Sequence, residues 1–118
     1  MKYSQSTGKI TSESGSLFGI GYSGHGEGKN NPAMENISNV GPLPKGKYSI
    51  GLPYNSEHTG PFTIPLYPFP SNEMFGRSDF KIHGDDGHGT ASLGCICTDR
   101  ETRENINNCT DKVLEVTE

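Results

Sequence analysis

The chain has 118 residues, a net charge of −4 and 30% hydrophobic residues, with 16 glycines, 8 prolines and no tryptophan. This length predicts a single domain, residues 1–118, because domains usually span about 100–200 residues. The low apolar content favours a mainly β fold of short segments. The acidic balance, with no cluster of lysine and arginine, argues against a nucleic-acid partner, and no apolar run approaches the ~18 residues of a membrane span.

The first half of the chain predicts one hairpin followed by a long structured loop. Residues 2–13 alternate around the turn formers Ser6, Thr7 and Gly8, which is typical of a β-hairpin. Glycine, asparagine and proline are then so frequent over residues 21–45 that we expect a loop with at most a helical turn at 32–36.

The second half predicts strands around one helix. Residues 46–51, 61–69 and 78–84 have strand character, and the prolines of 61–69 favour an edge position for that strand. Thr98 with Glu101 three residues later is a capping-box pattern, which predicts a helix of two to three turns after Cys97. Residues 112–117 alternate as a terminal strand.

The stretch IHGDDGHGTASLGCIC, residues 82–97, carries the chemistry. His83 ends a predicted strand, and Cys95 directly precedes the predicted helix. A cysteine nucleophile needs its thiolate, which a histidine base and a helix N-terminus both favour. Backbone N–H groups around Leu93, Gly94 and Cys95 could face a developing oxyanion, and Ser92 could fix the loop by hydrogen bonds.

Three other interpretations fit the same residues. Cys95 could be a buried structural cysteine in a disulfide-stabilised binding module. His83, His88, Cys95 and Cys97 could instead bind zinc, although the C-x-C spacing is unusual for it. A different cysteine–histidine peptidase or a sortase-like transferase is the third alternative.

Several motifs in order give a more specific indication. IHGDDGHGTASLGCI resembles the signature of the L,D-transpeptidases (YkuD-related), in which a strand-end His-Gly precedes Ser-x-Gly-Cys-Ile. The chain is still more similar to the L,D-transpeptidase-like toxins of type VI secretion systems. Their upstream motifs stand here as YSGHG (22–26), NNP (30–32) and GPLPKGKYSI (41–50).

The resemblance implies roles for particular residues. Cys95 would be the nucleophile, His83 its base, and the Gly84 carbonyl the group that orients the imidazole, while Ser92 and Gly94 shape the loop. Cys97 stands where the L,D-transpeptidases have an arginine, so the substrate carboxylate would need another partner. The expected substrate-binding residues are Arg100, Arg103, Tyr22 and Ser23; with Arg77 and Lys81, the two arginines could also form a basic rim.

The resemblance also implies a fold and a function. The fold would be a small β-sandwich or barrel-like catalytic domain. The activity would be cysteine-dependent L,D-carboxypeptidase or L,D-transpeptidase action on peptidoglycan tetrapeptide stems through a thioester, with no cofactor and no metal. The protein would be an antibacterial effector made in the cytoplasm without a signal peptide, exported by a secretion machinery, and active in a target cell's periplasm, where an immunity protein would neutralise it.

The three cysteines, Cys95, Cys97 and Cys109, cannot all pair with one another. In an oxidising periplasm, Cys97 and Cys109 are expected to form a disulfide that leaves Cys95 free.

Overall fold

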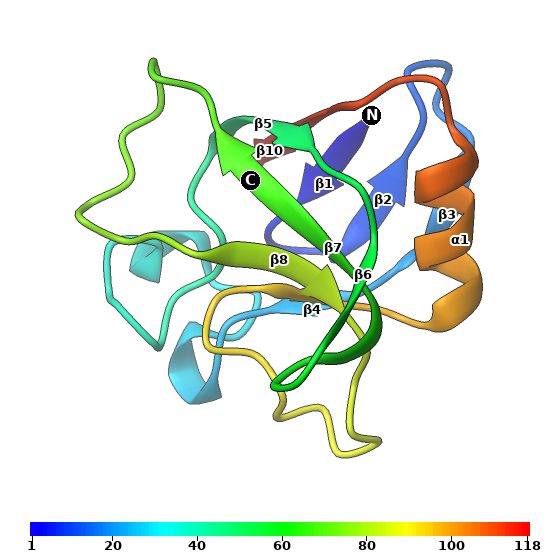
Figure 1. Ribbon diagram of the computed structural model, residues 1–118. Helices are drawn as coiled ribbons and strands as arrows, with labels where there is room; N and C mark the ends of the chain where they lie inside the picture. The colour runs from blue at the N-terminus through cyan, green and yellow to red at the C-terminus, as the bar shows by residue number, and fades with distance from the viewer.

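Ten short strands and one α-helix form the structure, a computed structural model that describes residues 1–118 (Figure 1). The predicted mainly β fold with one helix after the cysteine stretch is confirmed. The strands are β1 (Lys2–Ser4), β2 (Lys9–Thr11), β3 (Leu17–Ile20), β4 (Tyr22–Ser23), β5 (Gly46–Ile50), β6 (Tyr54–Ser56), β7 (Gly60–Pro68), β8 (Phe80–His83), β9 (Ile96–Cys97) and β10 (Val113–Thr117). The helix is α1 (Arg100–Asn108), and two short 3₁₀ turns, η1 (Gly26–Gly28) and η2 (Pro32–Met34), lie in the long loop.

The strands form one mixed sheet with the order β3-β2-β1-β10-β5-β7-β8-β9-β4, and β6 pairs additionally with β7. Two pairs are parallel, β1 with β10 and β8 with β9, and the others are antiparallel. The predicted hairpin is β1–β2, and the predicted terminal strand is β10, which joins the first strand of the chain to β5.

The sheet curls until its two ends meet. β3 and β4 stand at opposite ends of the strand order, yet only Gly21 separates them in the chain. At this seam the Gly21 N–H donates to the Gly8 carbonyl at 2.8 Å. A side chain on Gly21 would place its Cβ 2.5 Å from the Cys97 carbonyl oxygen, so the close approach requires glycine. The result is a barrel-like closure with few exposed edges.

The core lies inside the curled sheet. Its members are mostly β-branched and aromatic residues contributed by the short strands, as expected where one face of each strand is buried. They are Met1, Tyr3, Ile10, Leu43, Tyr48, Ile50, Ile64, Leu66, Phe80, Ile82, Ile96, Ile106, Leu114 and Val116. The helix α1 packs beside β3 (Figure 1), and its Ile106 joins the core. No helix has the length and apolar character needed to cross a bilayer.

Two sequence predictions about local structure are wrong. The helix is capped by Asp99, whose carboxylate accepts a hydrogen bond from the Thr102 N–H at 2.8 Å. Thr98 does not cap: its N–H continues the strand pairing by donating to the His83 carbonyl at 3.0 Å, and its hydroxyl donates to the Ile20 carbonyl at 3.3 Å.

The proline-rich strand β7 is not an edge, since it pairs with both β5 and β8. Pro65 is tolerated there because it lies opposite Gly51, just beyond the last residue of β5, and needs only its carbonyl to accept the Gly51 N–H at 2.9 Å.

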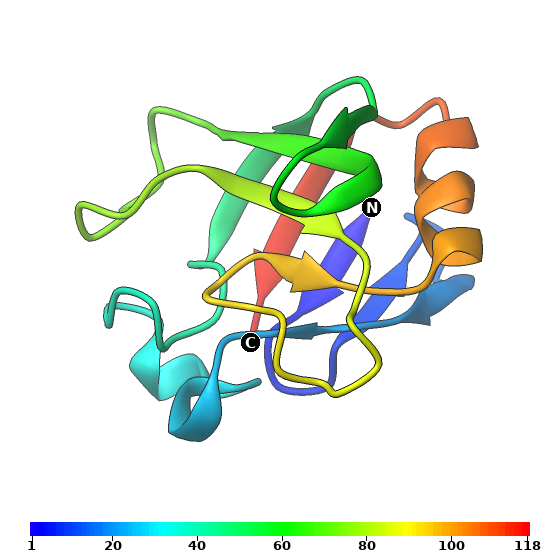
Figure 2. The same cartoon turned by 60° about the horizontal axis from the view of Figure 1, so that its bottom comes forward.

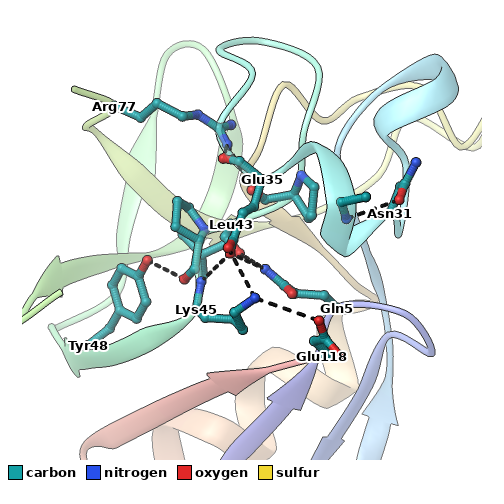
Figure 3. A network of polar contacts seen from close by, with 11 residues as sticks. Gln5, Asn31, Glu35, Leu43, Lys45, Tyr48, Arg77 and Glu118 are labelled. Carbon is teal, nitrogen blue, oxygen red and sulfur yellow. Dashed lines mark hydrogen bonds and ion pairs between the residues drawn. The ribbon is translucent and has the colours of Figure 1, made fainter. Parts of the chain in front are cut away.

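The long loop before β5 is fastened to the sheet through Glu35 (Figure 3). The Glu35 carboxylate accepts hydrogen bonds from the Gln5 side chain at 3.0 Å and from the Lys45 N–H at 2.9 Å, and it pairs with the Lys45 ammonium at 3.1 Å. Its backbone carbonyl accepts from the Arg77 guanidinium at 2.5 Å. These contacts connect the loop, the first strand and the segment that precedes β8.

The cap at Asp99 predicts a specific loss of stability. Asp99→Ala should lower the free energy of unfolding by about 1 kcal/mol, whereas Asp99→Asn should keep most of it because asparagine also caps. Urea denaturation at neutral pH measures both variants. The hydrogen bond to Thr102 holds the pKa of Asp99 below its usual value, so the native cap should be lost only as the pH falls through this lowered pKa. Equal losses in the two variants would contradict the assignment of the cap.

Candidate active site

The pairing of β8 with β9 places the predicted catalytic residues on one face. The two strands are parallel, with Ile82 opposite Ile96 and His83 opposite Cys97. Because side chains alternate along a strand, the two isoleucines point into the core, while Lys81 and His83 share the opposite face with Cys95 and Cys97. The same register puts Lys81 across from Cys95.

The His83 imidazole is held in one orientation. The side chain is buried, and its Nδ1 lies 2.8 Å from the Gly84 carbonyl oxygen. Since a carbonyl only accepts, we assign the proton to Nδ1, which leaves Nε2 as the basic nitrogen. Burial lowers the pKa of His83, and the cations Arg103 and Lys81 lower it further, so the ring is neutral at pH 7. The predicted contact with Gly84 is therefore present, and it leaves His83 ready to accept a proton.

Two thiols lie near this imidazole in different surroundings. Cys97 Sγ is 3.6 Å from Nδ1 and 3.8 Å from Nε2, is almost fully buried, and has its pKa raised to about 12 by that burial. Cys95 is partly exposed, and its Sγ donates a long hydrogen bond to the Asp79 carbonyl oxygen at 3.9 Å. Burial also raises the Cys95 pKa, against the backbone N–H and ammonium of Lys81 and the charge of Arg77. Cys95 is thus the thiol that a substrate can reach.

Cys95 and His83 line a common cleft with a volume of about 1000 Å³. One wall is the segment 54–59, and the others are the segment 76–81 and the loop positions Ala91 and Leu93. Direct hydrogen bonding between Cys95 and His83 is absent, and the two groups meet only through the space of this cleft. The cleft is large enough for several residues of a peptide.

Ser92 and Gly94 shape the loop that carries Cys95. The buried Ser92 hydroxyl donates to the Cys95 carbonyl at 2.6 Å and accepts from the N–H groups of Gly24 at 2.9 Å and Gly94 at 3.0 Å. Gly94 has φ of 135°, and a Cβ there would lie 2.4 Å from Arg77 Nη2. The Gly94 conformation and its neighbours therefore exclude a side chain.

Tyr22 and Ser23, expected as substrate-binding residues, lie behind this loop. Ser23 is fully buried; its hydroxyl donates to the Gly94 carbonyl and accepts from the Leu43 N–H, both at 2.8 Å. The Tyr22 hydroxyl donates to Asp85 at 2.6 Å and accepts from the Ala91 N–H at 2.9 Å. Both side chains fasten the loop, and neither lines the Cys95 cleft.

Arg100 and Arg103 are likewise not brought together with Cys95. Arg103 is buried and donates to the carbonyls of Thr98 at 2.6 Å, Phe62 at 3.1 Å and Pro61 at 3.5 Å. Arg100 lies over the Phe62 ring at 4.4 Å. The two arginines line a separate hollow of about 530 Å³ on the side of Cys97.

Arg77 supports the site in a way that its sequence position did not indicate. Its guanidinium is buried and donates to four backbone carbonyls: Glu35 at 2.5 Å, Pro42 at 2.9 Å, Gly41 at 3.0 Å and Leu93 at 3.3 Å. It thereby joins the GPLP motif to the loop of Cys95. An arginine surrounded by polar residues in the sequence resembles a surface residue, so the sequence placed it only on a basic rim.

The expected disulfide and the zinc alternative do not form. All three cysteines are free, and Cys97 and Cys109 flank opposite ends of α1. A helix of this length separates its ends by about 14 Å, far beyond the reach of a disulfide. No group of three or more histidine, cysteine, aspartate or glutamate side chains is arranged to hold a metal ion. His88 stays in the exposed glycine-rich loop, where its N–H donates to Asp86.

The fold and the cleft define a small, curled β domain that presents one accessible thiol beside a buried imidazole. The Tlde1 domain model matches residues 19–116, and the chain belongs to this family. The family is one of type VI secretion effectors, so the chain is an antibacterial effector whose class implies a secretion machinery, delivery into a target cell and an immunity partner. No curated protein and no solved structure matches the chain.

The hydrogen bonds of Ser92 predict a loss of stability in the loop. Ser92→Ala removes the acceptor of two N–H groups and the donor to Cys95, so the free energy of unfolding should fall by about 1–3 kcal/mol. Ser38→Ala is the matched control, because Ser38 lines the same cleft but is exposed and makes no hydrogen bond. Denaturation curves of the two variants test this, and similar curves would contradict the role of Ser92.

The burial of the thiols predicts an order of alkylation. In the native protein, iodoacetamide should modify Cys95 and leave Cys97 intact, and mass spectrometry of the digested protein assigns the sites. The raised pKa of Cys95 means that its alkylation rate should still be rising at pH 9, because the thiolate fraction is still growing. A plateau below pH 8 would show instead a thiolate stabilised by an imidazolium. Protein unfolded in guanidinium chloride, in which every thiol reacts, is the control.

Proposed function

We propose that this domain is a cysteine-dependent L,D-carboxypeptidase and L,D-transpeptidase that acts on peptidoglycan tetrapeptide stems. The observation that carries the proposal is that Cys95 is the accessible thiol on the strand face of His83 and opens with it into one large cleft. The motif resemblance supplies the substrate class, and the membership of an effector family is consistent with a cell-wall target.

The proposed reaction begins with attack by Cys95 Sγ on the carbonyl carbon of the L-centre of diaminopimelate. His83 Nε2 takes the thiol proton as the carbon–sulfur bond forms. The same proton then passes to the departing amine of the terminal D-alanine as the carbon–nitrogen bond breaks, leaving a thioester on Cys95. The neutral imidazole suits this role, because it must first accept a proton and then return it.

The thioester has two fates in an open cleft. Water would release a tripeptide, which is carboxypeptidase activity, while a free D-amino acid would replace D-alanine by exchange. In both cases His83 would remove a proton from the attacking group. Both reactions would corrupt the target wall by removing or altering the stem that cross-linking enzymes use.

A backbone N–H is available for the oxyanion. The Gly94 N–H is already used by Ser92, whereas the Cys95 N–H donates to no other group of the protein. This free donor belongs to the nucleophile itself and lies next to the position where the tetrahedral oxygen would form. The Leu93 N–H, which the sequence also suggested for this role, likewise donates to no other group of the protein.

The domain would act in the periplasm of the target bacterium, since that is where stem peptides are accessible. There it would meet the target's wall and, in sister cells, a periplasmic immunity protein. The Cys95 cleft is the surface that such an inhibitor would have to cover to protect the stems.

Mass analysis of a purified disaccharide-tetrapeptide tests the proposal. The native protein should remove the terminal D-alanine, or exchange it when a D-amino acid is added. Cys95→Ala should abolish this by at least about 10³-fold, because removing a nucleophile leaves only binding and oxyanion effects.

Cys97→Ala is the matched control, since it removes the buried thiol on the same strand face and should retain most of the activity. Unchanged tetrapeptide in the presence of folded, reduced native protein would refute the proposal. Loss of activity in Cys97→Ala but not in Cys95→Ala would move the nucleophile to Cys97.

A further inference from the structure

The cleft contains a cation, Lys81, across from the proposed nucleophile Cys95. We propose that Lys81 is a specificity-determining residue that binds the terminal carboxylate of the leaving D-amino acid, and that Asp79 pairs with Lys81 until the substrate replaces it. This inference rests on the proposed function and adds the recognition of one substrate group.

Only two permanent cations line the Cys95 cleft, Arg77 and Lys81. The Arg77 guanidinium is buried, and the N–H groups of both terminal nitrogens donate to four backbone carbonyls, which leaves only its Nε–H without a partner. Arg100 and Arg103 lie in the separate hollow beside Cys97. Lys81 is therefore the one cation lining the cleft whose charged end is not held by backbone carbonyls, and its ammonium can turn to a substrate carboxylate.

The position of Lys81 matches the distance that the reaction requires. The strand register places it across from Cys95, and neighbouring strands are about 4.8 Å apart. The terminal carboxylate of the stem belongs to the residue that follows the scissile carbonyl, and consecutive Cα atoms are about 3.8 Å apart. A peptide whose carbonyl meets Cys95 thus carries its terminal carboxylate within reach of a flexible lysine on the next strand.

The ion pair with Asp79 shows that Lys81 already accommodates a carboxylate there. Lys81 Nζ lies 2.6 Å from Asp79 Oδ1, and the lysine side chain is only 17% exposed whereas that of Asp79 is 85% exposed. Asp79 also has φ of 67°, a left-handed conformation that aspartate adopts more readily than most residues other than glycine. An ion pair whose carboxylate is this exposed is weak, so the internal partner is easily displaced.

Substrate binding would strengthen the ion pair between Lys81 and the stem carboxylate, which replaces the ion pair between Lys81 and Asp79. A peptide lying in the cleft excludes water from the half-buried ammonium, and an ion pair in lower dielectric is stronger. The carboxylate would gain a charge-assisted hydrogen bond, while Asp79 would turn into solvent at little cost. Lys81 would in this way select stems that end in a free carboxylate.

Binding to the folded but inactive Cys95→Ala protein tests the inference without depending on catalysis. Calorimetry compares a tetrapeptide stem with the same stem carrying a C-terminal amide. The acid should bind at least about tenfold more tightly than the amide, and Lys81→Met in this background should weaken the acid by a similar factor without affecting the amide. Lys81→Arg should restore the preference in part, and Asp79→Asn should tighten binding of the acid severalfold.

Two outcomes would overturn the inference while leaving the proposed function intact. One is equal binding of acid and amide. The other is a preference for the acid that survives Lys81→Met. A stem amidated instead at the side-chain carboxylate of diaminopimelate should keep the full effect of Lys81, and loss of the effect there would reassign Lys81 to that carboxylate. Failure of the Cys95→Ala protein to bind either stem would contradict both the inference and the proposed function.

Kinetics of the active protein separate carboxylate binding from activation of the thiol. If Lys81 recognises the carboxylate, Lys81→Met should raise KM for the acid and not for the C-terminal amide, while loss of the ammonium beside Cys95 should change kcat for both substrates alike. If it acted only by favouring the Cys95 thiolate, the variant would lower kcat equally for both substrates and shift the pH profile to higher pH, and the inference would be wrong.

Discussion

The parallel pairing of β8 with β9 is the constraint on which the candidate site depends. One face of the pair contributes Ile82 and Ile96 to the core, so neither strand can slip by one residue without exposing its isoleucine. The opposite face is thereby fixed as the row of Lys81, His83, Cys95 and Cys97. The same burial that stabilises the fold aligns the reactive groups.

Parallel pairing also explains the glycine-rich loop. A chain that leaves the end of one strand must return to the start of its parallel neighbour, which needs a long connection. Here that connection is residues 84–95, which cross the face of the molecule between β8 and β9 (Figure 2). It contains no helix of its own, so its shape must come from contacts with other segments.

Those contacts come from motifs far away in the sequence. The Ser23 hydroxyl donates a hydrogen bond to the Gly94 carbonyl, and the Gly24 N–H donates one to the Ser92 hydroxyl. Arg77 donates both to the Leu93 carbonyl and to the Gly41 carbonyl of the GPLP motif. A buried guanidinium that lost its carbonyl partners would be strongly destabilising, so the arginine and the motif depend on each other. The upstream motifs thus support the reactive loop from behind, and they do not themselves form the cleft that we propose for substrate.

The local pattern of the sequence predicted the strands and the helix better than it predicted which residues contact one another across the fold. Alternation and turn residues identified the hairpin, the strands at 46–50, 80–83 and 113–117, and the helix, because these depend on neighbours in the chain. The edge position of β7, the Thr98 cap and the Cys97–Cys109 disulfide were wrong, because each depends on what lies across the sheet or along the helix. His83, Gly84 and Cys95 could be grouped through the motif resemblance, whereas the burial of Arg77 and Arg103 had no local signal.

Cys95 and Cys97 lie on one strand face, and their different burial gives two identical thiols different accessibility. Cys97 lies closer to the imidazole, yet it is almost fully buried, and its raised pKa keeps it neutral. Cys95, two residues earlier, lies where the strand has not yet begun and the cleft is open. A residue at position 97 therefore faces the imidazole and the hollow of Arg100 and Arg103, and it does not line the Cys95 cleft. The cysteine that replaces the arginine of the L,D-transpeptidases fits such a position, and a cation that serves the cleft has to come from the neighbouring strand, where Lys81 stands.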